Sequence, residues 1–141
     1  MGIRRVAALS VMLSAYLLTL SFSSQADAPT AEGPIILKQG VYKGSWVDRK
    51  YSGDLVLNLV DNQATVRFDH ADKSCLGDKK FAATFKDDDS VEIANPFVVD
   101  VGGRCGVFDV TLTRDGETLE FYFHRRKYVN TPFTGSVVIP R

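Results

Sequence analysis

The chain has 141 residues, 45% of them hydrophobic, and its 17 basic side chains balance its 17 acidic ones. A chain so nearly neutral has no basic footprint for a nucleic acid, and this excludes nucleic-acid binding as a leading function. Its length allows a single domain with a modest core.

Residues 1–26 have the pattern of a cleaved signal peptide. Arg4 and Arg5 form a positive start, residues 6–22 are mostly apolar, and Ser24-Gln25-Ala26 offers small residues for cleavage. The apolar segment is interrupted by Ser and Thr and falls short of the roughly 20 apolar residues that a transmembrane helix needs. We therefore expect an exported protein, periplasmic or extracellular, with no membrane span after signal cleavage.

The two cysteines, Cys75 and Cys105, both lie in the part expected to be exported. In an oxidising compartment, a single pair of cysteines predicts a disulfide, which would contribute on the order of 3–4 kcal/mol in the chain-entropy model. The alternative is a nucleophilic cysteine with a histidine partner. A bonded cysteine cannot act as a catalytic thiol, so the two interpretations exclude each other.

Residues 27–39 are expected to form a flexible lead-in, followed by one β-domain at residues 40–141. The first strand is expected around residues 40–48 and contains Trp46, the only tryptophan.

The clearest hairpin is expected at residues 53–68. Leucine occupies every second position of residues 55–59, which is the signature of a strand with one buried face. Apolar and polar residues also alternate in residues 64–68, and the dipeptide Asp61-Asn62 between the two segments is typical of a tight turn.

Similar alternation predicts further strands in the segments 81–85, 91–93, 108–113, 119–124 and 133–139. No stretch has helical periodicity. About eight short strands at hairpin spacing predict an all-β fold, an antiparallel up-and-down barrel or sandwich with one disulfide.

Phenylalanines concentrate on the inward phase of these strands, which predicts a filled core. They are Phe68, Phe81, Phe85, Phe108, Phe121, Phe123 and Phe133. A shift of one residue in strand phase would move these rings to the outside and reverse the prediction.

Gly44-x-Trp46 on the first strand of an exported β-meander resembles the calycin group, which comprises lipocalins, avidins and bacterial metalloprotease inhibitors. The resemblance implies an eight-stranded barrel in which Trp46 closes one end and a basic residue near the last strand packs across it. Arg125, Arg126 and Arg141 are the candidates for that residue. A closing core residue is favoured over a ligand-stacking role for Trp46, and Gly44 leaves room for the ring.

The chemistry-bearing residues favour no catalytic site. His70 lies between Asp69 and Asp72 and could share a metal, but no second ligand cluster accompanies it. The run 87–89 of three aspartates could hold calcium, although its spacing is not that of an EF-hand and a solvated turn is the favoured interpretation. No Gly-x-Ser-x-Gly motif is present. We expect no metal, no cofactor and no enzymatic activity.

The most suggestive surface feature combines aromatic and basic residues, the composition of protein-interface anchors. It consists of Tyr122, His124, Arg125, Arg126, Lys127 and Tyr128, with Trp46 as a further candidate binding residue. The expected partner is another protein, or else a small ligand or glycan.

These observations lead to three functional hypotheses. The leading one is a non-catalytic binding protein, such as an inhibitor of a secreted enzyme, with a filled core and a working outer surface. The alternative is a carrier of a small apolar ligand, which requires an open barrel mouth and an internal cavity. The third is a minor hydrolase that uses His70 or His124 in a cleft beside a perturbed carboxylate.

Overall fold

The computed structural model describes residues 29–68, 77–102, 105–126 and 132–141. This part of the chain is all-β. Its strands are β1 (Ile35–Lys38), β2 (Gly40–Val47), β3 (Ser52–Val60), β4 (Gln63–Phe68), β5 (Lys79–Phe81), β6 (Thr84–Phe85), β7 (Ser90–Ile93), β8 (Phe97–Gly102), β9 (Gly106–Asp115), β10 (Thr118–Arg125) and β11 (Phe133–Val138). The expected signal peptide, His70, Cys75, Lys127 and Tyr128 lie outside the described residues. Across the described ranges, no helix is long and apolar enough to cross a membrane.

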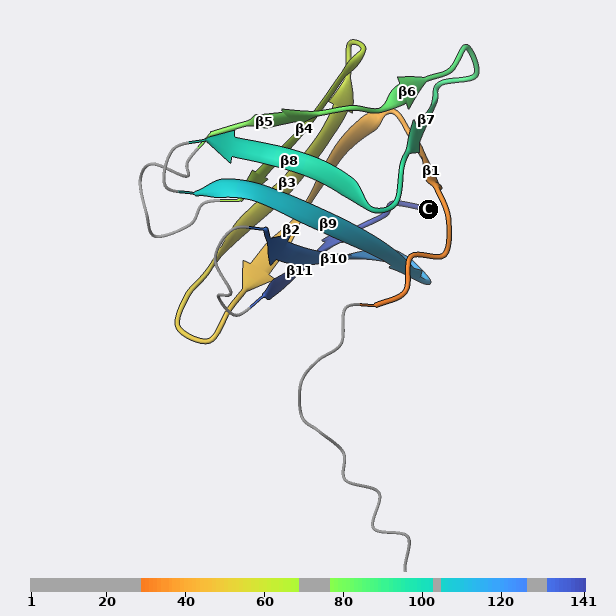
Figure 1. The fold of residues 1–141 in the computed structure, drawn as a ribbon. Helices are drawn as coiled ribbons and strands as arrows, with labels where there is room; N and C mark the ends of the chain where they lie inside the picture. Colours follow the sequence, from red (N-terminus) through yellow and green to blue (C-terminus); the bar gives the residue numbers. More distant parts are fainter. Residues whose placement is uncertain (1–28, 69–76, 103–104, 127–131) are drawn as a thin grey trace, which may run out of the picture.

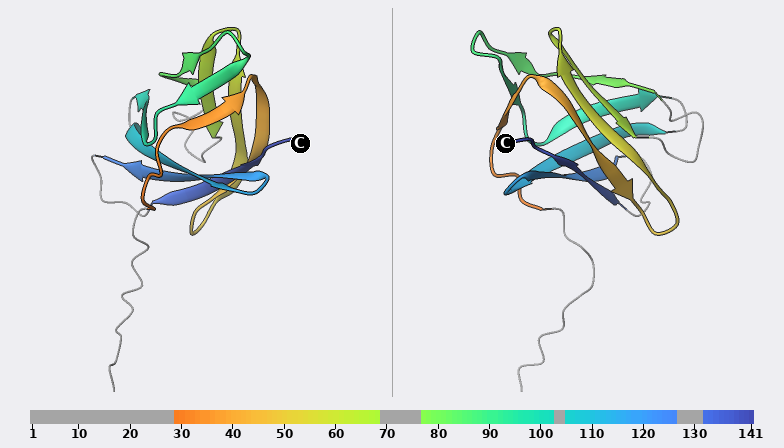
Figure 2. Two further views of the ribbon diagram at one scale, coloured as in Figure 1. Left: turned by 90° about the vertical axis from the view of Figure 1, so that its right-hand side faces the viewer. Right: turned by 180° about the vertical axis from the view of Figure 1, so that it is seen from behind.

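Eight strands form one antiparallel sheet in the order β5-β4-β3-β2-β11-β10-β9-β8. The last strand, β11, pairs with β2, so the two ends of the meander meet and the sheet curls into a barrel (Figures 1 and 2). The predicted all-β fold is confirmed, in the form of a nearly closed barrel.

The barrel closes between β5 and β8, which lie side by side (Figure 1) but share no ladder of hydrogen bonds in the described residues. Phe81 of β5 and Phe97 of β8 stack there, with ring centroids 4.3 Å apart and an interplanar angle of 29°. Side-chain packing therefore closes the seam where backbone pairing does not.

The hairpin predicted at residues 53–68 is formed by β3 and β4, with Leu57 opposite Val66 in the register. Asp61 and Asn62 at its turn have φ angles of 53° and 57°. A tight hairpin turn needs two residues with positive φ, and Asp and Asn tolerate this conformation better than other non-glycine residues.

A second sheet of three strands, in the order β1-β7-β6, lies beside the barrel (Figure 1). Strand β1 falls inside the segment expected to be a flexible lead-in, so that expectation does not hold for Ile35–Lys38. The strand forms because Leu37 pairs with Val91 and both side chains join the hydrophobic core. Residues 29–34 precede it without regular structure.

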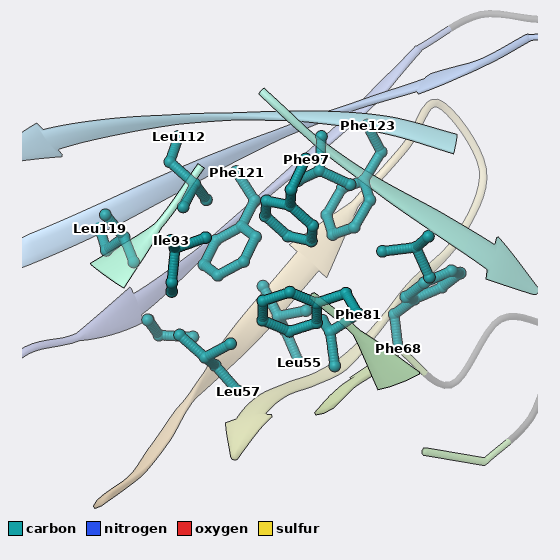
Figure 3. Packing of buried hydrophobic residues seen from close by; sticks show 14 of the residues in the cluster. Leu55, Leu57, Phe68, Phe81, Ile93, Phe97, Leu112, Leu119, Phe121 and Phe123 are labelled. Atoms are coloured by element: carbon teal, nitrogen blue, oxygen red, sulfur yellow. The ribbon is translucent and has the colours of Figure 1, made fainter. Parts of the chain in front are cut away.

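The barrel interior is filled by aromatic rings and leucines that converge from facing strands (Figure 3). Phe123 and Phe133 stack at 4.5 Å, and Phe68 packs against both at 5.2 and 5.5 Å. Six of the seven phenylalanines expected inside are buried. Phe85 is half-buried, because it belongs to the small sheet and only packs against the core from outside.

Two glycines allow β2 and β11 to approach closely. A Cβ on Gly44 would lie 1.7 Å from the main-chain oxygen of Ser136, so this glycine is required by the backbone of β11. A Cβ on Gly135 would lie 2.7 Å from Leu55 Cδ2 and 3.2 Å from Trp46 Cβ. The residue that leaves room for the tryptophan is therefore Gly135, whereas Gly44 leaves room for the neighbouring strand.

Candidate binding surface

The predicted binding residues on β10 point in two directions. Tyr122 and His124 lie on the outward phase and alternate with the buried Phe121 and Phe123. Arg125 continues the inward phase, and its Nε is buried near Gly106, where an added Cβ would lie 3.6 Å away. The structure thus separates Arg125 from the outward surface to which the sequence assigned it.

Trp46 is 1% exposed and belongs to the core. Its ring makes an edge contact with Phe133, with centroids 5.5 Å apart. This burial fits a residue that closes one end of the barrel and leaves no exposed ring for stacking on a ligand.

Of the three candidate basic partners for Trp46, only Arg125 has a suitable position. β2 and β10 are both antiparallel to β11, so their carboxyl ends, which carry Trp46 and Arg125, lie at the same end of the barrel. Arg141 instead forms an ion pair with Glu117 at the β9–β10 turn, the opposite end.

Arg126 forms a two-pronged contact with Asp109 on the outside of the barrel. Its Nε donates to Asp109 Oδ2 at 2.8 Å and its terminal nitrogen to Oδ1 at 2.7 Å. These hydrogen bonds lower the pKa of Asp109, with smaller contributions from the charges of Arg126 and His124. His124 lies directly opposite Asp109 in the register. The positive charge of Arg126 is therefore largely compensated by the carboxylate of Asp109.

A groove of about 400 Å³ crosses the outer face of β2, β11, β10 and β9. We call it the outer groove. Its lining residues are Pro29, Ser45, Val47, Thr111, Thr113, Glu120, Phe121, Tyr122, Thr134, Gly135 and Ser136. Sequence reasoning found only Tyr122 among them. The available signal was the Ser or Thr on the outward phase of several strands, which an exposed sheet face would show equally.

A second hollow, of about 380 Å³, lies on the outer face of β3, β4 and β5. Asn58 and Thr65, which face each other in the register, line it together with Asp78 and Lys80. The Oδ1 of Asn58 is buried and accepts no hydrogen bond from the described residues. This hollow shares no lining residue with the predicted binding surface.

The other residues considered for metal binding or catalysis do not come together into a site within the described residues. Asp88, in the run of three aspartates, is exposed and accepts hydrogen bonds from the main-chain nitrogen and hydroxyl of Ser90. These bonds lower the pKa of Asp88. They indicate that Asp88 caps the turn. Within the described ranges, no three His, Cys, Asp or Glu residues converge in a way that could hold a metal ion. Cys105 is 3% exposed, but its expected partner is outside these ranges, so the disulfide stays a prediction.

Comparison of the chain with family models, with curated proteins and with solved structures gives no match in any of the three.

Proposed function

We propose that this chain is an exported, non-catalytic binding protein that acts through the outer surface of its barrel. The proposed partner is another protein, and inhibition of a secreted enzyme is the leading role. The observation that carries this proposal is the filled interior: Trp46 and the stacked phenylalanines occupy the space that a ligand would need.

The calycin relationship is part of the same proposal. It is supported by the nearly closed barrel of eight antiparallel strands and by the position of Gly44 and Trp46 on the strand that pairs with the last one. The burial of Trp46 and the inward phase of Arg125 at the same barrel end also agree with it. Because a fold does not specify a function, the calycin relationship concerns the barrel architecture and does not identify the partner of this chain.

The carrier alternative is less well supported. It requires an apolar cavity inside the barrel, and ligand pockets of that kind are lined predominantly by apolar side chains with space between them. In this chain the rings of Phe68, Phe123 and Phe133 pack against one another inside the barrel, and the two hollows described above open on the outer surface.

The hydrolase alternative is also less well supported for His124. Its neighbouring carboxylate, Asp109, already accepts two hydrogen bonds from Arg126, and its pKa is lowered. A carboxylate with a lowered pKa is a weaker general base near neutral pH.

Site-specific photo-crosslinking in the exporting host tests the proposed function. A photoreactive residue at position 124 should give a protein adduct that a second substitution, Arg126→Glu, abolishes. The same probe at Asp54, an exposed position on the outer face of β3, serves as the matched control. Equal adducts at both positions, or release of an apolar small molecule from the purified native protein, would refute the proposal.

A further inference from the structure

The outer groove has a structural cause. The outer face of a barrel is normally convex, but Gly135, which has no side chain, and Ser45 and Ser136, which have short ones, are among the residues that line this groove. Val47 and Tyr122 carry larger side chains and line the same groove. The two strands that carry Ser45 and Ser136, β2 and β11, approach closely at Gly44.

Hydroxyl groups dominate the polar lining. Six residues supply one each: Ser45, Thr111, Thr113, Tyr122, Thr134 and Ser136. A hydroxyl can donate one hydrogen bond and accept others, so such a surface matches a ligand whose own groups do both.

The lining contains a single charged residue, Glu120, which is exposed and forms no ion pair within the described ranges. A carboxylate accepts short, strong hydrogen bonds from hydroxyl groups. Tyr122 adds an aromatic ring with an apolar face and a polar end. From this combination we infer that the outer groove binds a neutral saccharide. The inference goes beyond the proposed function, in which the partner is another protein, and adds a second ligand on the same outer surface.

Other ligand classes fit the groove less well. An anionic ligand would meet the charge of Glu120, and no cationic side chain lines the groove to offset it. An extended peptide that adds to a sheet needs an unpaired strand edge, whereas β2, β11, β10 and β9 are each paired on both sides. The volume lies near the lower end of the roughly 300–1,000 Å³ that ligand pockets have, so the groove accommodates a short saccharide segment.

Nuclear magnetic resonance titration of the mature protein tests this inference. The probes are maltohexaose, xylohexaose and triacetylchitotriose, with a sulfated heparin fragment as the anionic comparison. At least one neutral probe should shift the amide signals of Ser45, Thr134 and Ser136 without shifting those of the β3–β4–β5 face. Glu120→Gln should weaken that binding by about fivefold, because the amide oxygen still accepts a hydrogen bond but a charged acceptor forms a bond roughly twice as strong.

The control is Asp115→Asn, the same chemical change at the β9–β10 turn outside the groove, which should leave the affinity unchanged. Three results would overturn the inference: no neutral probe shifts the groove signals, Glu120→Gln binds as well as the wild type, or the sulfated fragment binds the groove more tightly. If one of these occurs while the adduct at position 124 is still found, the saccharide site fails and the proposed function stands.

Discussion

The close contact between β2 and β11 gives the sharpest prediction for this fold. Gly44→Ala would place a Cβ 1.7 Å from the oxygen of Ser136 and 2.8 Å from Val137 Cα. Both neighbours are backbone atoms, which cannot rotate away as the end of a flexible side chain can. The strands must therefore separate over part of their pairing.

The magnitude follows from what the separation breaks. Losing roughly two backbone hydrogen bonds at about 1 kcal/mol each, together with about 1–3 kcal/mol of overpacking strain, gives a loss of about 3–5 kcal/mol. A domain of this size has a free energy of unfolding of about 5–15 kcal/mol in total, so the variant should be severely destabilised.

Denaturant unfolding measures this directly, because the only tryptophan is buried beside the contact and its fluorescence reports the transition. Gly40→Ala is the matched control on the same strand and the same phase. Its added Cβ would come no closer than 3.9 Å to Tyr42, so stability should be unchanged or slightly raised. Gly135→Ala, with its clash against Leu55 at 2.7 Å, should fall between the two because a side chain can move. If Gly44→Ala unfolds within about 1 kcal/mol of Gly40→Ala, the close approach of the strands is wrong.

Three further predictions concern the seam between β5 and β8, the contact of Asn95 with β9, and the ion pair between Arg126 and Asp109. Phe97→Ala, which removes the ring stack that joins β8 to β5, should lower the free energy of unfolding by about 3–5 kcal/mol in the same assay. Asn95→Ala removes two hydrogen bonds of 2.8 Å to the main chain of Leu112 and should cost about 1–3 kcal/mol, whereas no change would show that β9 does not need this contact. The pKa of Asp109 is lowered below its ordinary value of 3.8, so its stabilising contribution is present above that value and is lost as the pH falls through the lowered one. The wild type should therefore lose slightly more stability on acidification than Asp109→Asn, and equal losses in acid titrations of the two proteins would contradict the contact.

Much of the strand phase could be predicted from the sequence because it is local information. A strand with one buried face repeats every two residues, so Leu55, Leu57 and Leu59 identify their strand without knowledge of its partners. The turn at Asp61 and Asn62 is equally local, since it depends on which residues tolerate positive φ.

What could not be predicted depends on contacts between distant segments. Ile35–Lys38 is a short strand whose partner, Ser90–Ile93, lies more than fifty residues away, and nothing nearby in the sequence marks the pairing. Phe85 has the inward phase of its own strand, but that strand belongs to the small sheet. The role of Gly44 depends on the path of β11, which the sequence alone does not place beside β2.

The outer groove escaped prediction for the same reason. Its hydroxyl residues come from four strands, and they meet only because β11 pairs with β2 and joins the two ends of the meander. A serine or threonine on an outward phase is an ordinary surface residue when considered by itself. Only the completed sheet distinguishes a hydroxyl-lined groove from scattered polar side chains.

The fold also couples its interior to this outer face through one residue. Gly135 abuts Leu55 and Trp46 on the inner side of the sheet and is also one of the residues that line the outer groove. A side chain there would disturb core packing and groove shape together, so loss of binding in such a variant would say nothing about recognition. Glu120 avoids this difficulty, because it lies on the outward phase of β10 and its side chain is exposed. Recognition by the groove can therefore be separated from stability only through its outward side chains, with Glu120 as the most informative position.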